Sequence, residues 1–139
     1  MTGLDVNVWG MVLGGVSSMV IGSVYYADGV MGKQWKQLGK IDVKKFQKEF
    51  PKTAPLLFVG ALLTAFAVGI IDCFYERFYV ANWTSSALMA ALIVWAVVAV
   101  NLAIHGLMDQ RPFKYTVINI GNRFFSIMAM GLIYVWLHP

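Results

Sequence analysis

Four long apolar runs occupy most of this chain of 139 residues, and they limit its fold more than any other feature. The runs cover residues 6–26, 55–74, 86–108 and 118–136. As an α-helix, each is long enough to cross roughly 30 Å of hydrocarbon at about 1.5 Å per residue. Only 13% of the residues are charged, so a soluble bundle would lack the polar surface that faces water. The sequence therefore predicts an all-α integral membrane protein, a four-helix bundle forming a single domain over residues 1–139.

The basic residues are concentrated in two of the stretches that separate or border these runs. Ten of the eleven Lys and Arg residues lie in residues 33–52 and 111–123, and Arg77 alone lies between the second and third runs. Short segments rich in Lys and Arg remain in the cytoplasm. We therefore expect an N-out/C-out protein of the bacterial inner (plasma) membrane, with both basic stretches in the cytoplasm and both termini on the outer side.

The first basic stretch, residues 27–52, contains the pattern of a short amphipathic helix. Asp42 can cap its start, Pro51 is expected to end it, and Val43, Phe46 and Phe50 share one face. We expect this helix to lie in the interface between the membrane and the cytoplasm. A solvated helix packed on the bundle is the alternative.

The same stretch is expected to bind the anionic headgroups of the inner leaflet, because each basic residue near such a surface contributes about 1 kcal/mol. The side chains assigned to this contact are Lys33, Trp35, Lys36, Lys44, Lys45 and Lys48. The basic residues flank apolar runs instead of forming one polar face, so no nucleic-acid partner is expected.

Small residues recur at every fourth position in the first two runs. The strips are Gly14, Ser18 and Gly22 in the first run, and Ala61, Ala65 and Gly69 in the second. Such strips let helix backbones approach closely inside a membrane. They are compatible with packing within one chain or between copies.

Polar side chains inside apolar runs are costly, which makes them candidates for a functional site. Asn101, His105 and Asp109 are spaced by four residues and share one helical face. The groups expected to converge in a polar pocket near the cytoplasmic end are Asn101, His105, Asp109, Asn119, Asn122, Arg123, Tyr26 and Asp28. Asp109 would hold the His105 imidazole in one tautomer. The alternative is that these groups only form hydrogen bonds between helices.

The remaining acidic residues and the single cysteine give weaker indications of a functional site. Asp72 lies near the outer end of the second run, with Glu76 one turn further; we interpret both as interfacial, and a role in proton or cation entry is the alternative. Cys73 is the single cysteine and cannot form a disulfide within the chain. The sequence contains no metal-ligand pattern, nucleotide-binding loop or hydrolase elbow, so no metal and no cofactor are expected.

The two ends of the chain resemble the bacterial membrane family catalogued as domain of unknown function 1761. The segments that carry the resemblance are Gly22-Ser23-Val24-Tyr25-Tyr26, Gly32-Lys33-Gln34-Trp35, Gly39, Ile118-Asn119-Ile120-Gly121, Met130-Gly131-Leu132-Ile133 and Trp136. Tyr25 stands where the family usually has Trp, Ala27-Asp28 replaces Ser-Pro, and Met31 replaces Phe. The resemblance implies a small four-span inner-membrane protein, and it assigns no catalytic residues.

Three functions are compatible with this pattern. The leading hypothesis is a structural or accessory subunit without enzymatic activity, which packs with copies of itself or within a larger membrane complex. The first alternative is a small-solute or proton transporter or channel subunit with a polar path near Asn101 and His105. The second is a membrane-embedded enzyme acting on a lipid or quinone at the inner leaflet, with His105 as general base.

Overall fold

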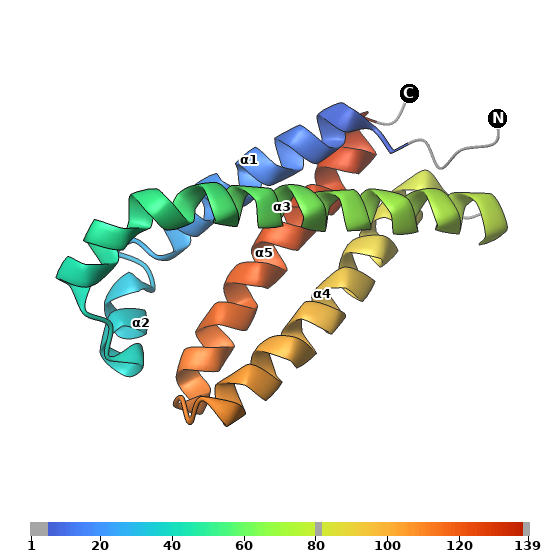
Figure 1. Ribbon diagram of the computed structural model, residues 1–139. Helices are drawn as coiled ribbons and strands as arrows, with labels where there is room; N and C mark the ends of the chain where they lie inside the picture. Colours follow the sequence, from blue (N-terminus) through green and yellow to red (C-terminus); the bar gives the residue numbers. More distant parts are fainter. Residues whose placement is uncertain (1–5, 80–81, 138–139) are drawn as a thin grey trace.

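The computed structural model describes residues 6–79 and 82–137, and it is helical throughout. Its elements are α1 (Val8–Tyr25), α2 (Gly32–Gly39), α3 (Val43–Tyr79), α4 (Trp83–Met108) and α5 (Phe113–Leu137) (Figure 1). Within the described ranges, α1, α3, α4 and α5 are long and apolar enough to cross a membrane, and no strand is present. The predicted all-α fold with four candidate spans is therefore confirmed.

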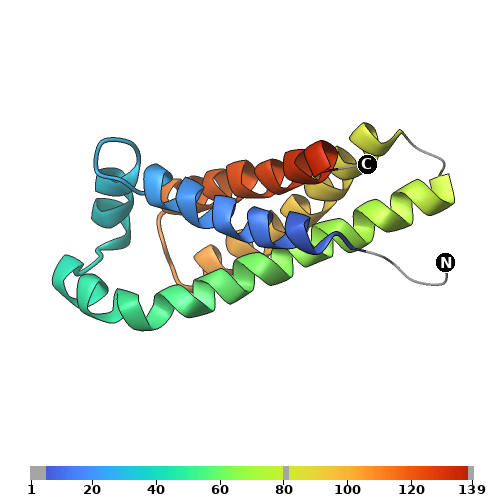
Figure 2. The ribbon, with the colours of Figure 1, turned by 90° about the horizontal axis from the view of Figure 1, so that it is seen from above.

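The four long helices alternate in direction and form a closed ring of neighbours. α1 packs beside α3 and α5, and α4 packs beside the same two helices. The connections at residues 26–42 and 109–112 lie at one end of the bundle, which we name the basic end (Figure 1 and Figure 2). The first and last described residues, the end of α3 and the start of α4 lie at the opposite end, which we name the terminal end.

The apolar core lies in the half of the bundle nearer the terminal end. Its buried side chains are Ala61, Ala65, Val68, Ala87, Ala90, Ala91, Ile127, Met130 and Tyr134. Most are small, so the helices approach closely: a Cβ added at Gly14 would lie 3.1 Å from the Cβ of Ala65, and one at Gly131 would lie 2.9 Å from the Cβ of Ala91. The Tyr134 hydroxyl also donates a hydrogen bond to the Ala65 carbonyl at 2.7 Å.

The small-residue strips are largely used inside this chain. Gly14 faces Ala65, and Gly69 faces Tyr134. Ser18 and Ala61 are also buried. Gly22 differs from the other five residues of the strips, because no heavy atom lies within 4 Å of the position that its Cβ would take. Contacts within the bundle thus account for most of the two small-residue strips, which were also compatible with packing between copies.

α3 is longer than the sequence predicts. Asp42 caps its start as expected, because its carboxylate accepts hydrogen bonds from the backbone N–H of Lys44 and Lys45 at 3.1 and 3.3 Å. The prediction that Pro51 ends a separate helix is wrong: α3 continues through Pro51 and Pro55. Each proline frees one carbonyl four residues earlier, and both carbonyls belong to exposed residues, Gln47 and Pro51, where water can bind them.

The short helix α2 is an element that the sequence analysis did not predict. It begins at Gly32, lacks a side-chain cap, and ends at Lys40 in the left-handed conformation. Trp35 anchors it: its ring stacks on Tyr115 at 6.2 Å between centroids and contacts Phe46 at 5.7 Å and Tyr26 at 4.9 Å. This aromatic cluster joins α1, α2, α3 and α5 at the basic end.

The junction between α1 and α2 depends on the absence of a side chain at Gly32. A Cβ there would overlap the Tyr26 carbonyl, whereas a Cβ at Gly29 in the same connection would meet no atom within 4 Å. We expect Gly32→Ala to reduce the free energy of unfolding by about 1–3 kcal/mol, as forced overpacking does. Thermal unfolding in a neutral detergent, followed by circular dichroism, measures this effect. Gly29→Ala is the control, and equal melting temperatures for the two variants would contradict the assignment.

Candidate functional site

The two halves of the bundle differ in how α3 and α4 meet. The two helices lie together toward the terminal end and diverge toward the basic end (Figure 1). Asn101 follows Val94 by seven residues, or about two helical turns. His105 follows Ala91 by fourteen residues, or about four turns. Each polar residue therefore shares a helical face with the earlier apolar one. Ala91 and Val94 are buried, whereas Asn101 and His105 are exposed. The core-facing side of α4 therefore becomes polar where α3 has moved away.

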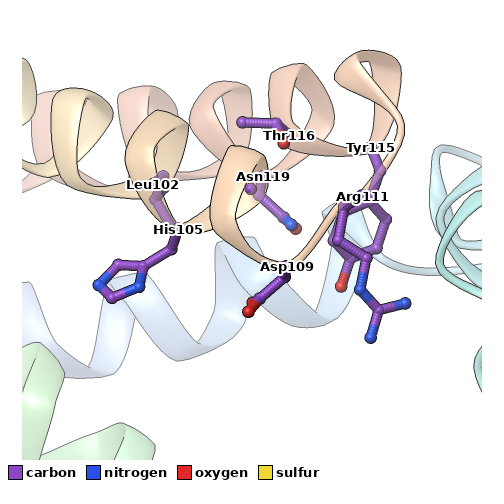
Figure 3. A pocket seen from close by; sticks show the side chains of 8 residues that line it. Leu102, His105, Asp109, Arg111, Tyr115, Thr116 and Asn119 are labelled. Carbon is purple, nitrogen blue, oxygen red and sulfur yellow. The ribbon is translucent and has the colours of Figure 1, made fainter.

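A pocket of about 220 Å³ lies between α4 and α5 at this end (Figure 3). Its lining residues are Leu102, His105, Gly106, Asp109, Arg111, Tyr115, Thr116 and Asn119. Three of the predicted pocket residues, His105, Asp109 and Asn119, are thus brought together. We name this cavity the polar pocket.

The expected interaction between His105 and Asp109 does not form. Both side chains are exposed and lie apart in Figure 3. Among the described residues, neither takes part in a side-chain hydrogen bond or an ion pair. The spacing of four residues places them on one face, but each side chain extends into open space on its own.

Two tyrosines that follow one another tie α1 to α5 beside the pocket. The Tyr26 hydroxyl donates to Asn119 Oδ1 at 2.6 Å, and the Tyr25 hydroxyl donates to the Ile118 carbonyl at 2.7 Å. Asn122 and Arg123 lie near the Tyr26 hydroxyl. Four of the predicted residues, Tyr26, Asn119, Asn122 and Arg123, therefore form a second group that shares Asn119 with the pocket.

This group extends into the core along α5. Asn122 is 7% exposed and Ser126, one turn further, is 1% exposed. Asn122 Oδ1 and Ser126 Oγ have no hydrogen-bond partner in the described part of the chain. Buried polar atoms are normally hydrogen-bonded, so these two are unsatisfied polar groups inside the bundle, and neither residue lines the pocket.

Two predicted pocket residues lie elsewhere. Asp28 is 73% exposed and forms an ion pair with Lys36 at 2.9 Å in the connection between α1 and α2. Asn101 is exposed, and its side-chain amide donates to the Val97 carbonyl of its own helix at 3.0 Å. Neither lines the pocket.

The residues assigned to headgroup binding differ in their exposure to solvent. Lys33, Lys44, Lys45 and Lys48 are exposed, so they are free to meet anions at the basic end. Trp35 is half-buried, because its ring packs in the aromatic cluster.

Arg111 is a site residue that the sequence analysis did not single out. Its guanidinium donates a hydrogen bond to the Gly39 carbonyl and lies 5.5 Å from the centroid of the Tyr115 ring. It thereby fixes the turn between α4 and α5 against α2. The spacing of Tyr115 and Thr116, four and three residues before Asn119, was the available signal for their place in the pocket.

Asp72 is buried, which corrects its interpretation as an interfacial residue. Its side chain is on the face of α3 that meets α4, and the residue is 8% exposed. The Ser86 hydroxyl is 2.6 Å from Asp72 Oδ1 and 2.9 Å from the Asp72 carbonyl. The pair joins α3 to α4 near the terminal end, so its evident role is structural.

Ser86→Ala is expected to lower the free energy of unfolding by about 1–3 kcal/mol, because it leaves the buried Asp72 side chain without this partner. Ser85→Ala is the matched control. Ser85 is exposed and bonds only to the nearby Asn82 carbonyl, so its loss should cost less than about 0.5 kcal/mol. Chemical unfolding in mixed detergent and denaturant compares the two. A Ser85→Ala effect as large as that of Ser86→Ala would contradict the structural role of the pair.

The fold and the site together define a helical protein with four candidate membrane spans and a polar pocket at one end. A family model described as "Protein of unknown function (DUF1761)" matches residues 9–135. The chain therefore belongs to this family, as the resemblance at its two ends predicted. No curated protein and no solved structure matches the chain.

Proposed function

We propose that this protein is a non-catalytic integral membrane protein that binds an amphipathic molecule of the cytoplasmic leaflet in the polar pocket. One observation carries the proposal. On α4, the core-facing residues from Ala87 to Val94 are apolar and buried, whereas His105, further toward the basic end, is polar and exposed. Polar groups inside the bilayer are energetically unfavourable, so their presence indicates a function.

The orientation proposed for this role places the basic end in the cytoplasm of a bacterial cell. The exposed lysines at that end, among them Lys33, Lys44 and Lys48, favour retention on the cytoplasmic side. They would also concentrate anionic lipids around the pocket entrance.

The same geometry favours binding over transport and over catalysis. Val68, Ile127 and Met130 are at most 1% exposed, so apolar side chains pack closely beyond the pocket, and this packing disfavours a transport path. The catalytic hypothesis required Asp109 to orient His105, and the two side chains do not meet. Binding requires only the shape and polarity that are present.

Assembly with copies of the chain or within a larger membrane complex is a second candidate, in which the protein acts as a structural or accessory subunit. Asn101 favours it. Its side chain is exposed. Asn101 lies eight residues before Asp109, or about 12 Å along the helix at 1.5 Å per residue, and this depth is inside the hydrocarbon region. A polar partner on a neighbouring helix would satisfy the remaining hydrogen-bonding capacity of this amide.

Native mass spectrometry of protein extracted in a mild detergent tests both candidates. We expect a retained lipid-sized adduct on the wild type. His105→Trp should fill the pocket entrance and reduce adduct occupancy about tenfold, which corresponds to about 1.4 kcal/mol. Ile104→Trp, at the exposed neighbouring position, is the control and should retain the adduct.

Equal occupancy in the wild type and both variants would contradict binding in the polar pocket. A stable oligomer without an adduct, which dissociates in Asn101→Leu, would instead support the second candidate.

A further inference from the structure

Arg123 is a charged side chain deep in a helix that otherwise has the character of a membrane span. It lies ten residues after the start of α5, or about 15 Å along the axis. It lies seven residues after Thr116 and seven before Met130, both of which are buried. Because seven residues are about two helical turns, Arg123 shares their face of α5.

The Arg123 guanidinium has no counter-ion within the described chain. Arg123 is half-buried and forms no hydrogen bond or ion pair with any described side chain. The sequences of α1, α4 and α5 contain no Asp or Glu at all. The acidic residues of α3 are Glu49, near its start at the basic end, and Asp72 and Glu76, toward the terminal end. Asp109, which follows α4 and lines the polar pocket, forms no ion pair with Arg123. An unpaired charge at membrane depth is strongly unfavourable, so a bound anion would compensate it.

The surroundings of Arg123 suit an anion that carries an apolar chain. Asn119, one turn toward the basic end, lines the polar pocket, and its amide N–H groups can donate hydrogen bonds to an anion. α3 and α4 expose large apolar side chains along the same half, such as Leu57 and Ile104. Long cationic side chains extend toward the membrane surface, which would bring the guanidinium toward the pocket.

We propose that Arg123 recognises the anionic group of the bound molecule, a phosphate or carboxylate on an amphiphile that enters from the cytoplasmic leaflet. This inference rests on the proposed binding function and names its ligand class. A guanidinium presents paired N–H donors that match both groups, and such charge-assisted bonds are the stronger ones. The amide nitrogen of Asn119, whose oxygen accepts from Tyr26, can donate a further hydrogen bond to the anion, and the apolar surfaces of α3 and α4 accommodate the acyl chain.

Competitive lipid binding in a neutral detergent tests the inference. The wild type is titrated with phosphatidylglycerol and with phosphatidylcholine, and bound lipid is counted by native mass spectrometry. We expect a preference of about tenfold or more for phosphatidylglycerol. Arg123→Gln should reduce this preference to about twofold or less while phosphatidylcholine still binds. Arg123→Lys, which retains the charge, should restore part of it.

Two further variants separate a loss of recognition from a loss of fold or of surface charge. Arg123→Met removes the charge but keeps a long side chain that an apolar environment accommodates, so it should fold and should also lose the preference. Lys114→Gln removes one exposed positive charge at the start of α5 and should leave the preference intact.

Two competitors identify the source of the anion. Displacement of phosphatidylglycerol from the wild type by inorganic phosphate would support an anion site that takes the free ion. Displacement by oleate but not by phosphate would support one that takes an acyl carboxylate. No displacement by either would support a phospholipid headgroup.

The outcomes that overturn the inference differ from those that overturn the proposed function. An unchanged phosphatidylglycerol preference in folded Arg123→Gln and Arg123→Met, with lipid still bound, would remove Arg123 from recognition. A wild-type protein that binds neither lipid would remove the binding function itself.

Discussion

The close approach of helices at small residues in the terminal half is the constraint on which the rest of this structure depends. Gly14 against Ala65 and Gly131 against Ala91 bring backbones within reach of direct contact. In a membrane such contacts replace the hydrophobic drive that packs a soluble core. Long helices that meet closely at one end and cross at an angle must separate at the other. The divergence of α3 and α4 toward the basic end is therefore a consequence of how tightly the terminal end is packed (Figure 1).

The basic half is held together by other means. Hydrogen bonds from Tyr25 and Tyr26 join α1 to α5, and Trp35 joins α2 to three other helices through its aromatic neighbours. Polar groups at core-facing positions, such as His105 and Arg123, then occupy space that apolar packing does not fill. A bundle built in this way has one closely packed half and one half with a polar pocket, and this difference supports the proposed binding function.

The sequence predicted the fold well because its strongest signals are local. Run length and apolarity predict the four candidate spans, and the Asp42 cap was also recognisable from the residues around it. The course of α3 through Pro51 could not be predicted, because it depends on water reaching the freed carbonyls at an exposed helix surface. The helix α2 was missed for a related reason: its stability comes from contacts of Trp35 with residues distant in sequence, such as Tyr115.

The candidate site was predicted less completely. Helical spacing correctly grouped His105 with Asp109 on one face, but it could not show that their side chains fail to meet. It also could not show that Asn119 bonds to Tyr26, whereas Asp28 pairs with Lys36. These outcomes depend on the angle between helices, which the residues of a single helix do not specify.

The most direct test of the account is the access of water-soluble reagents to α5 from each side of the membrane. Asn119→Cys and Met130→Cys, each in a Cys73→Ala background, would be treated with a membrane-impermeant thiol reagent in sealed right-side-out and inside-out vesicles. The account predicts that Asn119→Cys reacts only in inside-out vesicles, and that Met130→Cys, which lies in the sealed half, reacts in neither. Reaction of Met130→Cys from either side, or of Asn119→Cys from the outer side, would contradict a pocket that is open only to the cytoplasm.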